Sequence, residues 1–323
     1  MQSDSIITIA GPTASGKSAI AMQVARLARE RGVEIEIISM DSALPYKGMD
    51  IGTAKPTPEE LKEFVHHGIN MCDPEEIYSA AKFAKDAHQW IQEIKERGHT
   101  PLIVGGTMLY WRALVHGLSN LPTSDPLIRK DIATQAQNKG WPAMHDELMA
   151  IDPETAQRLQ KNDAQRISRA LEIFRQTGQP MSSWLRAEPK KTGRHDDAQI
   201  LDFRLITLEP SDRKWLHHRI EQRFNLMLEQ GFMEEMKALH ANPRLHPDLP
   251  SMRAVGYRQA WEYLDGKIDW ETFKEHGIAA TRQLAKRQLT WLRAIHQKET
   301  FDPIQADELQ ACRELCLSHY DIA

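Results

Sequence analysis

The chain has 323 residues, of which 41% are hydrophobic and 27% charged, and its formal net charge is −4. This length allows one large domain or two ordinary domains, and the composition is typical of a globular protein. The slightly negative charge gives no sign of nucleic-acid binding, so local charge has to be considered. Because no stretch approaches the roughly 20 apolar residues of a membrane span and residues 1–8 do not resemble a secretion signal, we expect a cytoplasmic protein that binds no membrane.

The first hundred residues alternate between strand and helix patterns. Residues 6–9, 35–38 and 101–104 are short apolar runs of strand character. Apolar residues at helical spacing predict helices over 19–31 and 80–97, each followed by a glycine that can end it. This alternation predicts a parallel sheet covered by helices.

A glycine-containing loop joins the first strand to the first helix. It fits the pattern G-x-x-x-x-G-K-[ST] with Gly11, Pro12, Thr13, Ala14, Ser15, Gly16, Lys17 and Ser18. In such a P-loop, backbone N–H groups converge on phosphate oxygens, the lysine adds positive charge, and the hydroxyl of Ser18 can bind Mg²⁺. The strand before the loop and the helix after it favour a real phosphate site over a chance match, but the motif does not distinguish a diphosphate from a triphosphate.

The pattern changes after the third strand. Only helical signals occur from Pro122 to about Arg186, and residues 190–197 are polar, as in a surface linker. Strand character returns at 200–208, and helices follow to about Lys298. We therefore expect an α/β fold with a P-loop NTPase-like parallel sheet core.

The expected boundaries follow from this change. Residues 1–121 and 198–300 form the discontinuous core domain, and residues 122–197 form an all-helical insertion domain. Residues 301–323 are weakly patterned, and we expect a loose tail there.

Asp41 follows the second strand, at the edge of the sheet where the phosphate loop lies. From this position alone it could hold Mg²⁺ through water or act as a general base toward an incoming nucleophile, and these two roles are about equally favoured. Capping of the next segment is a less favoured third role.

Gly105, Gly106 and Thr107 end the third strand. The glycines allow a close backbone approach, and Thr107 offers a hydroxyl to a phosphate or leaving-group oxygen. An ordinary strand-to-helix turn capped by the threonine fits the tripeptide equally well.

Basic side chains gather near the C-terminal end, where residues 277–298 contain no acid. On a helix, Arg282, Lys286 and Arg293 share one face, which could bind an RNA backbone, although a solvated helix face is the commoner explanation. The opposite face carries the apolar residues that we expect in the core, namely Leu284, Trp291 and Ile295.

Two further pairs leave the same choice open. Arg166 and Arg169 could contact RNA, or they could pair with Asp163 and Glu172 on the surface. Tyr257 and Trp261 lie four residues apart, a spacing more typical of core aromatics than of base stacking.

Longer strings of the sequence resemble the bacterial tRNA dimethylallyltransferases, also called tRNA isopentenyltransferases. The resemblance extends from about residue 6 to about residue 300, and its motifs are far more specific than the phosphate loop. They lie at 11–18, 41–44, 46–56, 104–110, 162–166, 169–172, 253–259, 281–288 and 290–293.

The resemblance implies a reaction and its partners. A dimethylallyl group passes from dimethylallyl diphosphate to N6 of the adenine on the 3′ side of the anticodon in a tRNA stem-loop, and Mg²⁺ is required. The P-loop holds the diphosphate rather than a nucleotide, Asp41 accepts the N6 proton, and Thr107 contacts the reacting centre. No obligate protein partner is implied.

The resemblance also implies which residues contact RNA. Besides Asp41 and Thr107, they are Ser42, Ala43, Leu44, Arg129, Gln165, Arg166, Ile167, Ser168, Arg169, Arg253, Ala254, Val255, Gly256, Tyr257, Arg258, Lys286, Arg287, Gln288, Leu289, Thr290, Trp291, Leu292 and Arg293. The sequence departs from the family at Asn70, where an acid is usual, around His67, in the polar segment 34–40, and in residues 300–323. None of these departures touches the expected catalytic residues.

Two other functions remain open from the residues alone. A P-loop kinase for a small molecule or nucleotide needs the same loop and could use Asp41 as a base toward a hydroxyl. An arginine-rich lid over the transferred phosphate would distinguish it. A non-catalytic or ATP-driven RNA-binding module is disfavoured, because Asp41 and Thr107 are expected at neighbouring strand ends.

Overall fold

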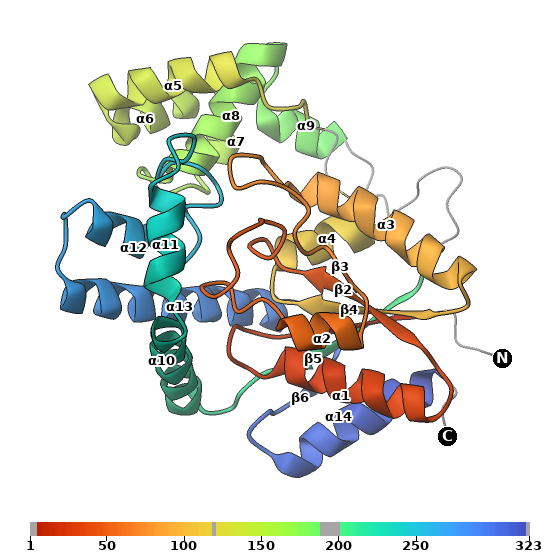
Figure 1. Cartoon of the computed structure of the whole chain (residues 1–323). Helices are drawn as coiled ribbons and strands as arrows, with labels where there is room; N and C mark the ends of the chain where they lie inside the picture. Colours follow the sequence, from red (N-terminus) through yellow and green to blue (C-terminus); the bar gives the residue numbers. More distant parts are fainter. Residues whose placement is uncertain (1–4, 118–120, 188–200, 321–323) are drawn as a thin grey trace. The chain divides into compact units, whose positions relative to one another are not determined.

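The computed structural model describes residues 5–117, 121–187 and 201–320, and the expected polar linker at 190–197 lies outside them (Figure 1). The chain divides into two compact units, one formed by residues 1–115 with 195–323 and the other by residues 116–194. No helix in the described ranges is long and apolar enough to cross a membrane.

The first unit is built on a six-stranded sheet with the order β3-β2-β4-β1-β5-β6, in which all neighbours are parallel. Parallel strands covered on both faces consist of apolar runs, which is why β1 and β2 are buried along their whole length. The predicted α/β fold is confirmed. The strands are β1 (Ile6–Ala10), β2 (Ile35–Met40), β3 (His66–His67), β4 (Thr100–Gly105), β5 (Phe203–Leu208) and β6 (Glu299–Phe301).

Helices cover both faces of this sheet. On one face Ile7, Ile9 and Ile37 pack with residues of α1 and α14, and on the other Ile38 and Ile103 pack with residues of α3 and α4. The helices of this unit are α1 (Lys17–Glu30), α2 (Pro58–Glu63), α3 (Ala80–Glu96), α4 (Met108–His116), α10 (Arg213–Glu229), α11 (Phe232–His240), α12 (Tyr257–Leu264), α13 (Trp270–Arg293) and α14 (Ala306–His319).

The second unit is helical throughout its described residues and has an apolar core of its own, which includes Ile132, Met144 and Leu171. The buried carboxylate of Glu172 accepts hydrogen bonds from Ser124 Oγ at 2.6 Å and Asp125 N at 2.8 Å. These bonds tie the entering chain to α8. The helices are α5 (Pro126–Lys139), α6 (Trp141–Ile151), α7 (Pro153–Ala156), α8 (Ala164–Thr177) and α9 (Met181–Ala187).

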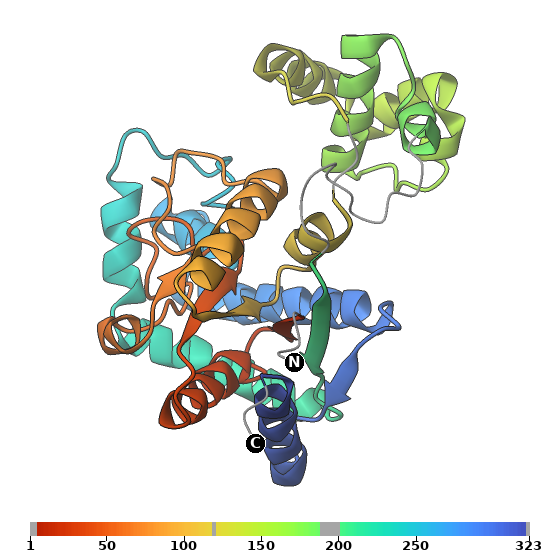
Figure 2. The same cartoon turned by 90° about the vertical axis from the view of Figure 1, so that its right-hand side faces the viewer.

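The expected loose tail at 301–323 is wrong. Residues 299–301 form the edge strand β6, and α14 packs beside α1 (Figures 1 and 2). The buried positions of α14 include Cys312 and Cys316, which are 0% exposed and four residues apart. Buried cysteines behave as small apolar side chains, so this stripe is apolar although it contains few aliphatic residues.

The orientation expected for Trp291 is also wrong, because its side chain is 42% exposed. The buried positions of α13 include Phe273, Gly277, Ala285 and Leu292. Small residues let this face approach α10 closely, and a Cβ on Gly277 would lie 2.4 Å from the ring of Phe224. Backbone proximity, rather than the number of apolar residues, therefore determines which face of α13 is buried.

The packing of α14 predicts that Cys316→Asp lowers the free energy of unfolding by about 3 kcal/mol or more, since an unpaired charge would be buried. Ser318→Asp, on the exposed side of the same helix, is the matched control and should change it by less than about 0.5 kcal/mol. Urea unfolding measures both. Equal small effects of the two substitutions would contradict the packing of α14.

Candidate active site

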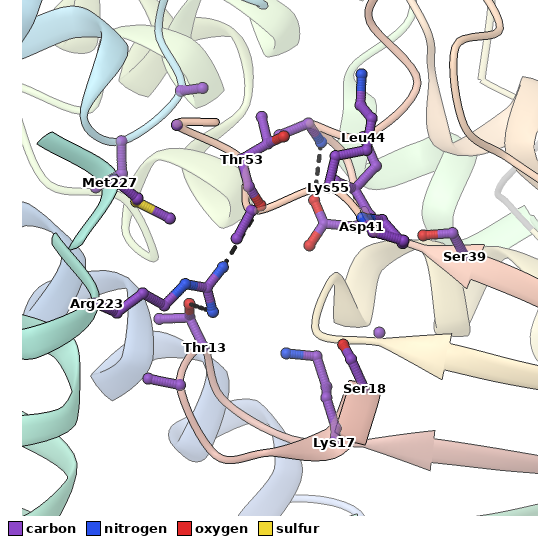
Figure 3. A pocket seen from close by; sticks show the side chains of 18 of the residues that line it. Thr13, Lys17, Ser18, Ser39, Asp41, Leu44, Thr53, Lys55, Arg223 and Met227 are labelled. Atoms are coloured by element: carbon purple, nitrogen blue, oxygen red, sulfur yellow. Dashed lines mark hydrogen bonds between the residues drawn. The ribbon is translucent and has the colours of Figure 1, made fainter. Parts of the chain in front are cut away.

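A cavity of about 370 Å³ opens in the first unit, at the carboxyl ends of β1, β2 and β4, where ligands bind in open α/β sheets. One wall carries the phosphate loop and Asp41, and the other carries residues of α10 to α13. Figure 3 shows Lys17, Ser18, Asp41 and Arg223 pointing toward the same space. Thr13, Ala14, Lys17 and Ser18 of the expected phosphate loop thus line one cavity together with Asp41, whereas Thr107 is not among the lining residues.

The phosphate loop runs from β1 into α1, as its motif requires. Ala14 has φ 64° and Gly16 has φ 95°, and a left-handed alanine in a loop is the kind of local strain that occurs at functional sites. A Cβ on Gly11 would lie 3.0 Å from the carbonyl oxygen of Leu208, so the loop packs directly on β5. No side chain caps α1, and its first N–H groups are therefore available to an anion.

Lys17 extends from the loop into the cavity. Burial lowers the pKa of its ammonium group, nearby Asp41 raises it and Arg223 lowers it, and the net result is a pKa of about 8. In the free protein, the negative charge near this ammonium group does not balance its desolvation, and a bound diphosphate would supply more negative charge.

Two arginines of α10 reach the same loop and were not expected from the sequence. Arg219 Nε donates to the carbonyl oxygen of Ala14 at 2.9 Å, and Arg223 Nη1 lies 3.4 Å from Thr13 Oγ1. Burial lowers the pKa of Arg223, against the effect of Asp41. Their i,i+4 spacing was the available signal, but such spacing is common on solvated helices.

Asp41 and Thr107 are brought together by the ends of β2 and β4. Thr107 Oγ1 accepts from Ser42 N at 3.0 Å, and Thr107 N donates to Met40 O at 3.2 Å. Gly105 makes this approach possible, since a Cβ there would lie 1.9 Å from the oxygen of Met40. The capping role of Asp41 is present, because its Oδ1 accepts from Ala43 N at 2.9 Å, yet its carboxylate also faces the cavity (Figure 3).

A second unexpected group, Glu235 of α11, holds the segment 50–52. Its carboxylate accepts from the backbone N–H groups of Asp50, Ile51 and Gly52 at 2.8, 2.7 and 3.2 Å. The hydroxyl of Tyr257 donates to the same carboxylate at 2.5 Å. Thr53, which follows this segment, lines the cavity, so Glu235 determines where one cavity wall lies.

The residues expected to contact RNA separate into exposed and buried groups. In the first unit, Arg253, Arg258, Lys286, Arg287, Thr290, Trp291 and Arg293 are exposed, and Leu44, Ala43, Ala254, Val255 and Gln288 line the cavity. In the second unit, Gln165 and Arg166 are exposed.

Three of the expected RNA contacts are contradicted for their side chains. Ile167, Tyr257 and Leu292 are 0% exposed and belong to the apolar cores, so their side chains cannot reach an RNA in this conformation. The burial expected for Tyr257 and Trp261 from their helical spacing is confirmed.

The donor atoms around Ser18 fit Mg²⁺. Ser18, Ser39 and Asp41 offer oxygen atoms in the same cavity (Figure 3). Within the described ranges no cluster of three or more acidic, histidine or cysteine side chains forms a metal cage. Mg²⁺ is commonly held by one or two protein oxygens together with water and substrate phosphates, which this arrangement allows.

The role of Glu235 predicts that Glu235→Ala leaves three backbone N–H groups without their acceptor and lowers the free energy of unfolding by about 2 kcal/mol. Glu234→Ala, at the exposed neighbouring acid, is the control and should have little effect. Chemical unfolding measures both. Similar stabilities of the two variants would show that Glu235 does not hold the segment.

The burial of Lys17 predicts that Lys17→Met raises the free energy of unfolding at pH 7 by about 1–2 kcal/mol. Because the pKa of the ammonium group is about 8 in the folded protein and 10.5 otherwise, the unfolded wild type binds more protons between these values. The free energy of unfolding of the wild type should therefore rise between pH 8 and pH 10.5 relative to that of Lys17→Met. The difference between the two proteins should disappear near pH 10.5. Urea unfolding from pH 7 to 10.5 tests this, with the exposed Lys62→Met as control. A pH-independent difference would contradict it.

Comparisons with known proteins point to one family. The family profile described as IPP transferase matches residues 44–295. The tRNA dimethylallyltransferase of Polynucleobacter necessarius is 54% identical, over 97% of this chain and 94% of that relative. The corresponding protein of Cupriavidus taiwanensis is 53% identical, over 96% and 94%.

Solved structures give the same result. The tRNA isopentenylpyrophosphate transferase of Bacillus halodurans is 34% identical with a TM-score of 0.66, over 98% of this chain and 97% of that one. A eukaryotic dimethylallyltransferase described as acting on tRNA is 26% identical with a TM-score of 0.78, over 98% and 79%. The chain therefore belongs to the IPP transferase family, the tRNA dimethylallyltransferases.

Proposed function

We propose that this enzyme transfers the dimethylallyl group of dimethylallyl diphosphate to N6 of the adenine on the 3′ side of the anticodon of a tRNA, with Asp41 as general base. One observation carries the proposal: the carboxylate of Asp41 and the ammonium group of Lys17 point into the same cavity (Figure 3). The leaving group and the proton acceptor of such a transfer need this proximity.

The diphosphate is bound by groups that gather at one end of the cavity. The uncapped N-terminus of α1 and the side chains of Lys17 and Arg223 provide positive charge there. Ser18 would hold Mg²⁺, which when bound stabilises the charge that develops on the departing diphosphate.

The transfer forms one bond and breaks one. The lone pair of N6 forms a bond to C1 of the dimethylallyl group, the C1–O bond breaks, and the diphosphate departs with that electron pair. An adenine amine is a poor nucleophile because its lone pair is delocalised into the ring, and Asp41 offsets this by accepting the N6 proton. The hydroxyl of Thr107, held beside Asp41 through Ser42, donates to the charged oxygen near the reacting carbon.

The tRNA is bound through the exposed basic and aromatic side chains of α13, which include Lys286, Arg287, Trp291 and Arg293. Such a surface fits a phosphate backbone and unstacked bases. The target adenine leaves its stack at a cost of a few kcal/mol, which is lower in a loop than in a duplex. Three free, buried cysteines agree with a reducing cytoplasm as the place of reaction.

The described residues of the second unit do not form the arginine-rich lid that would distinguish a kinase. A lid would need arginines that are free to meet a transferred phosphate. In the described part of the second unit, each arginine lies within ion-pair distance of a carboxylate, at Arg129, Arg158, Arg166, Arg169, Arg175 and Arg186. Arg166 thus pairs with Asp163 on the surface, as the alternative stated, whereas Arg169 pairs with the buried carboxylate of Glu172.

The test combines the protein with Mg²⁺, dimethylallyl diphosphate and an anticodon stem-loop that carries adenine 3′ of the anticodon, and weighs the RNA. We expect a mass gain of one dimethylallyl group. Asp41→Asn should lower kcat by about 10²–10⁴-fold with little change in KM for the diphosphate, because the amide cannot accept the proton. Asp73→Asn, at an exposed acid, is the control. No mass gain would overturn the reaction, and an unchanged kcat would overturn the role of Asp41.

A further inference from the structure

Gln288 of α13 joins the phosphate loop to the end of β4. Its Oε1 accepts a hydrogen bond from the backbone N–H of Thr13 at 2.8 Å, and its Nε2 donates to the carbonyl oxygen of Gly106 at 3.0 Å. Its neighbours Lys286 and Arg287 are exposed, whereas Gln288 is half-buried and lines the cavity. We call these two hydrogen bonds the Gln288 bridge.

The surrounding backbone leaves room for this side chain and little else. A Cβ on Gly106 would lie 2.4 Å from Nε2 of Gln288 and 2.9 Å from the carbonyl oxygen of Gly11. The entering limb of the loop, the end of β4 and Gln288 are thus closely packed. Arg219 and Arg223 hold the same limb from α10, through Ala14 and Thr13.

The Gln288 bridge changes which N–H groups the loop can offer to a ligand. The N–H groups at the start of α1 are uncapped and can bind phosphate oxygens. On the entering limb, the N–H of Ser15 donates to Pro12 O at 3.2 Å, and that of Thr13 donates to Gln288. A chain that extends beyond the two phosphates held at the helix would meet the entering limb, where the donor at Thr13 is already occupied.

We propose that Gln288 restricts the phosphate loop to a two-phosphate chain, by occupying with its amide the donor and the space that a third phosphate would use. This inference rests on the proposed diphosphate-dependent function and adds a physical reason why a nucleotide-type loop excludes a nucleoside triphosphate. The amide is neutral, so it blocks this position without repelling the diphosphate beside it.

The test measures the binding of inorganic pyrophosphate and inorganic tripolyphosphate by calorimetry, with Mg²⁺ and without RNA. We expect the Kd of the wild type for pyrophosphate to be lower than its Kd for tripolyphosphate by about tenfold or more. Gln288→Ala should reduce this preference by about tenfold, because the N–H of Thr13 and the vacated space become available to the third phosphate. An undiminished preference in a folded Gln288→Ala protein would overturn the inference.

A matched control separates this effect from a general change in α13. Gln283→Ala alters an exposed residue of the same helix, so the phosphate preference should stay at the wild-type value. Gln288→Asn shortens the side chain by one methylene while keeping an amide, and it should give an intermediate phosphate preference. This variant serves as the test if Gln288→Ala fails to fold. A wild-type preference in Gln288→Asn would count against the inference.

The same titrations distinguish failure of the inference from failure of the proposed function. If the wild type binds tripolyphosphate more tightly than pyrophosphate, diphosphate selection is absent, and the proposed function loses its support together with the inference. If the wild type favours pyrophosphate and both Gln288 variants keep this preference, only the role of Gln288 is wrong.

Discussion

The structure depends on an imbalance of charge inside one cavity. Lys17 and Arg223 are half-buried cations, desolvation lowers the pKa of both, and Asp41 is the carboxylate that opposes this shift in each. The uncapped end of α1 adds a partial positive charge to the same place. Holding these cations together without an anion destabilises the free protein, and the diphosphate that we propose as ligand would offset that destabilisation. The cavity is in this sense built for a ligand of high negative charge.

The cavity walls are held by side chains that are either neutral or already hydrogen-bonded to backbone groups. Glu235 holds one wall through three backbone N–H groups, and the Gln288 bridge holds the other side through two backbone groups. Backbone groups have fixed positions, so these contacts orient the walls without adding charge to the cavity. The supports come from α11 and α13, which are distant in sequence from the loop that they fix.

The sequence predicted the parts of the fold and site that depend on local patterns. Buried parallel strands are apolar runs, and the phosphate loop has its own spacing, so β1, β2, β4 and the loop were found at nearly their observed positions. Asp41 and Thr107 followed from the rule that ligands bind at the carboxyl ends of strands. The family resemblance, more than any pattern, indicated the reaction.

The parts that were missed depend on contacts between distant segments. β3 has two residues and β6 has three, which is too few to show the alternating pattern of a strand. The buried residues of α14 include cysteines rather than mainly aliphatic residues. Arg223 and Glu235 look like ordinary charges on amphipathic helices until the fold brings them to the cavity. Trp291 was assigned to the core because apolar character alone does not show which face of α13 meets its neighbours.

The strand order has a consequence for the growing chain on the ribosome. β1 lies between β4 and β5, and β5 begins at residue 203, after the whole second unit has been synthesised. The second unit has an apolar core drawn only from its own residues, so it is able to fold while the sheet still lacks β5 and β6, two of its six strands. The phosphate loop, although it is made first, remains unsupported until Arg223 and Gln288 emerge. The site proposed for the diphosphate is therefore complete only when synthesis is nearly finished.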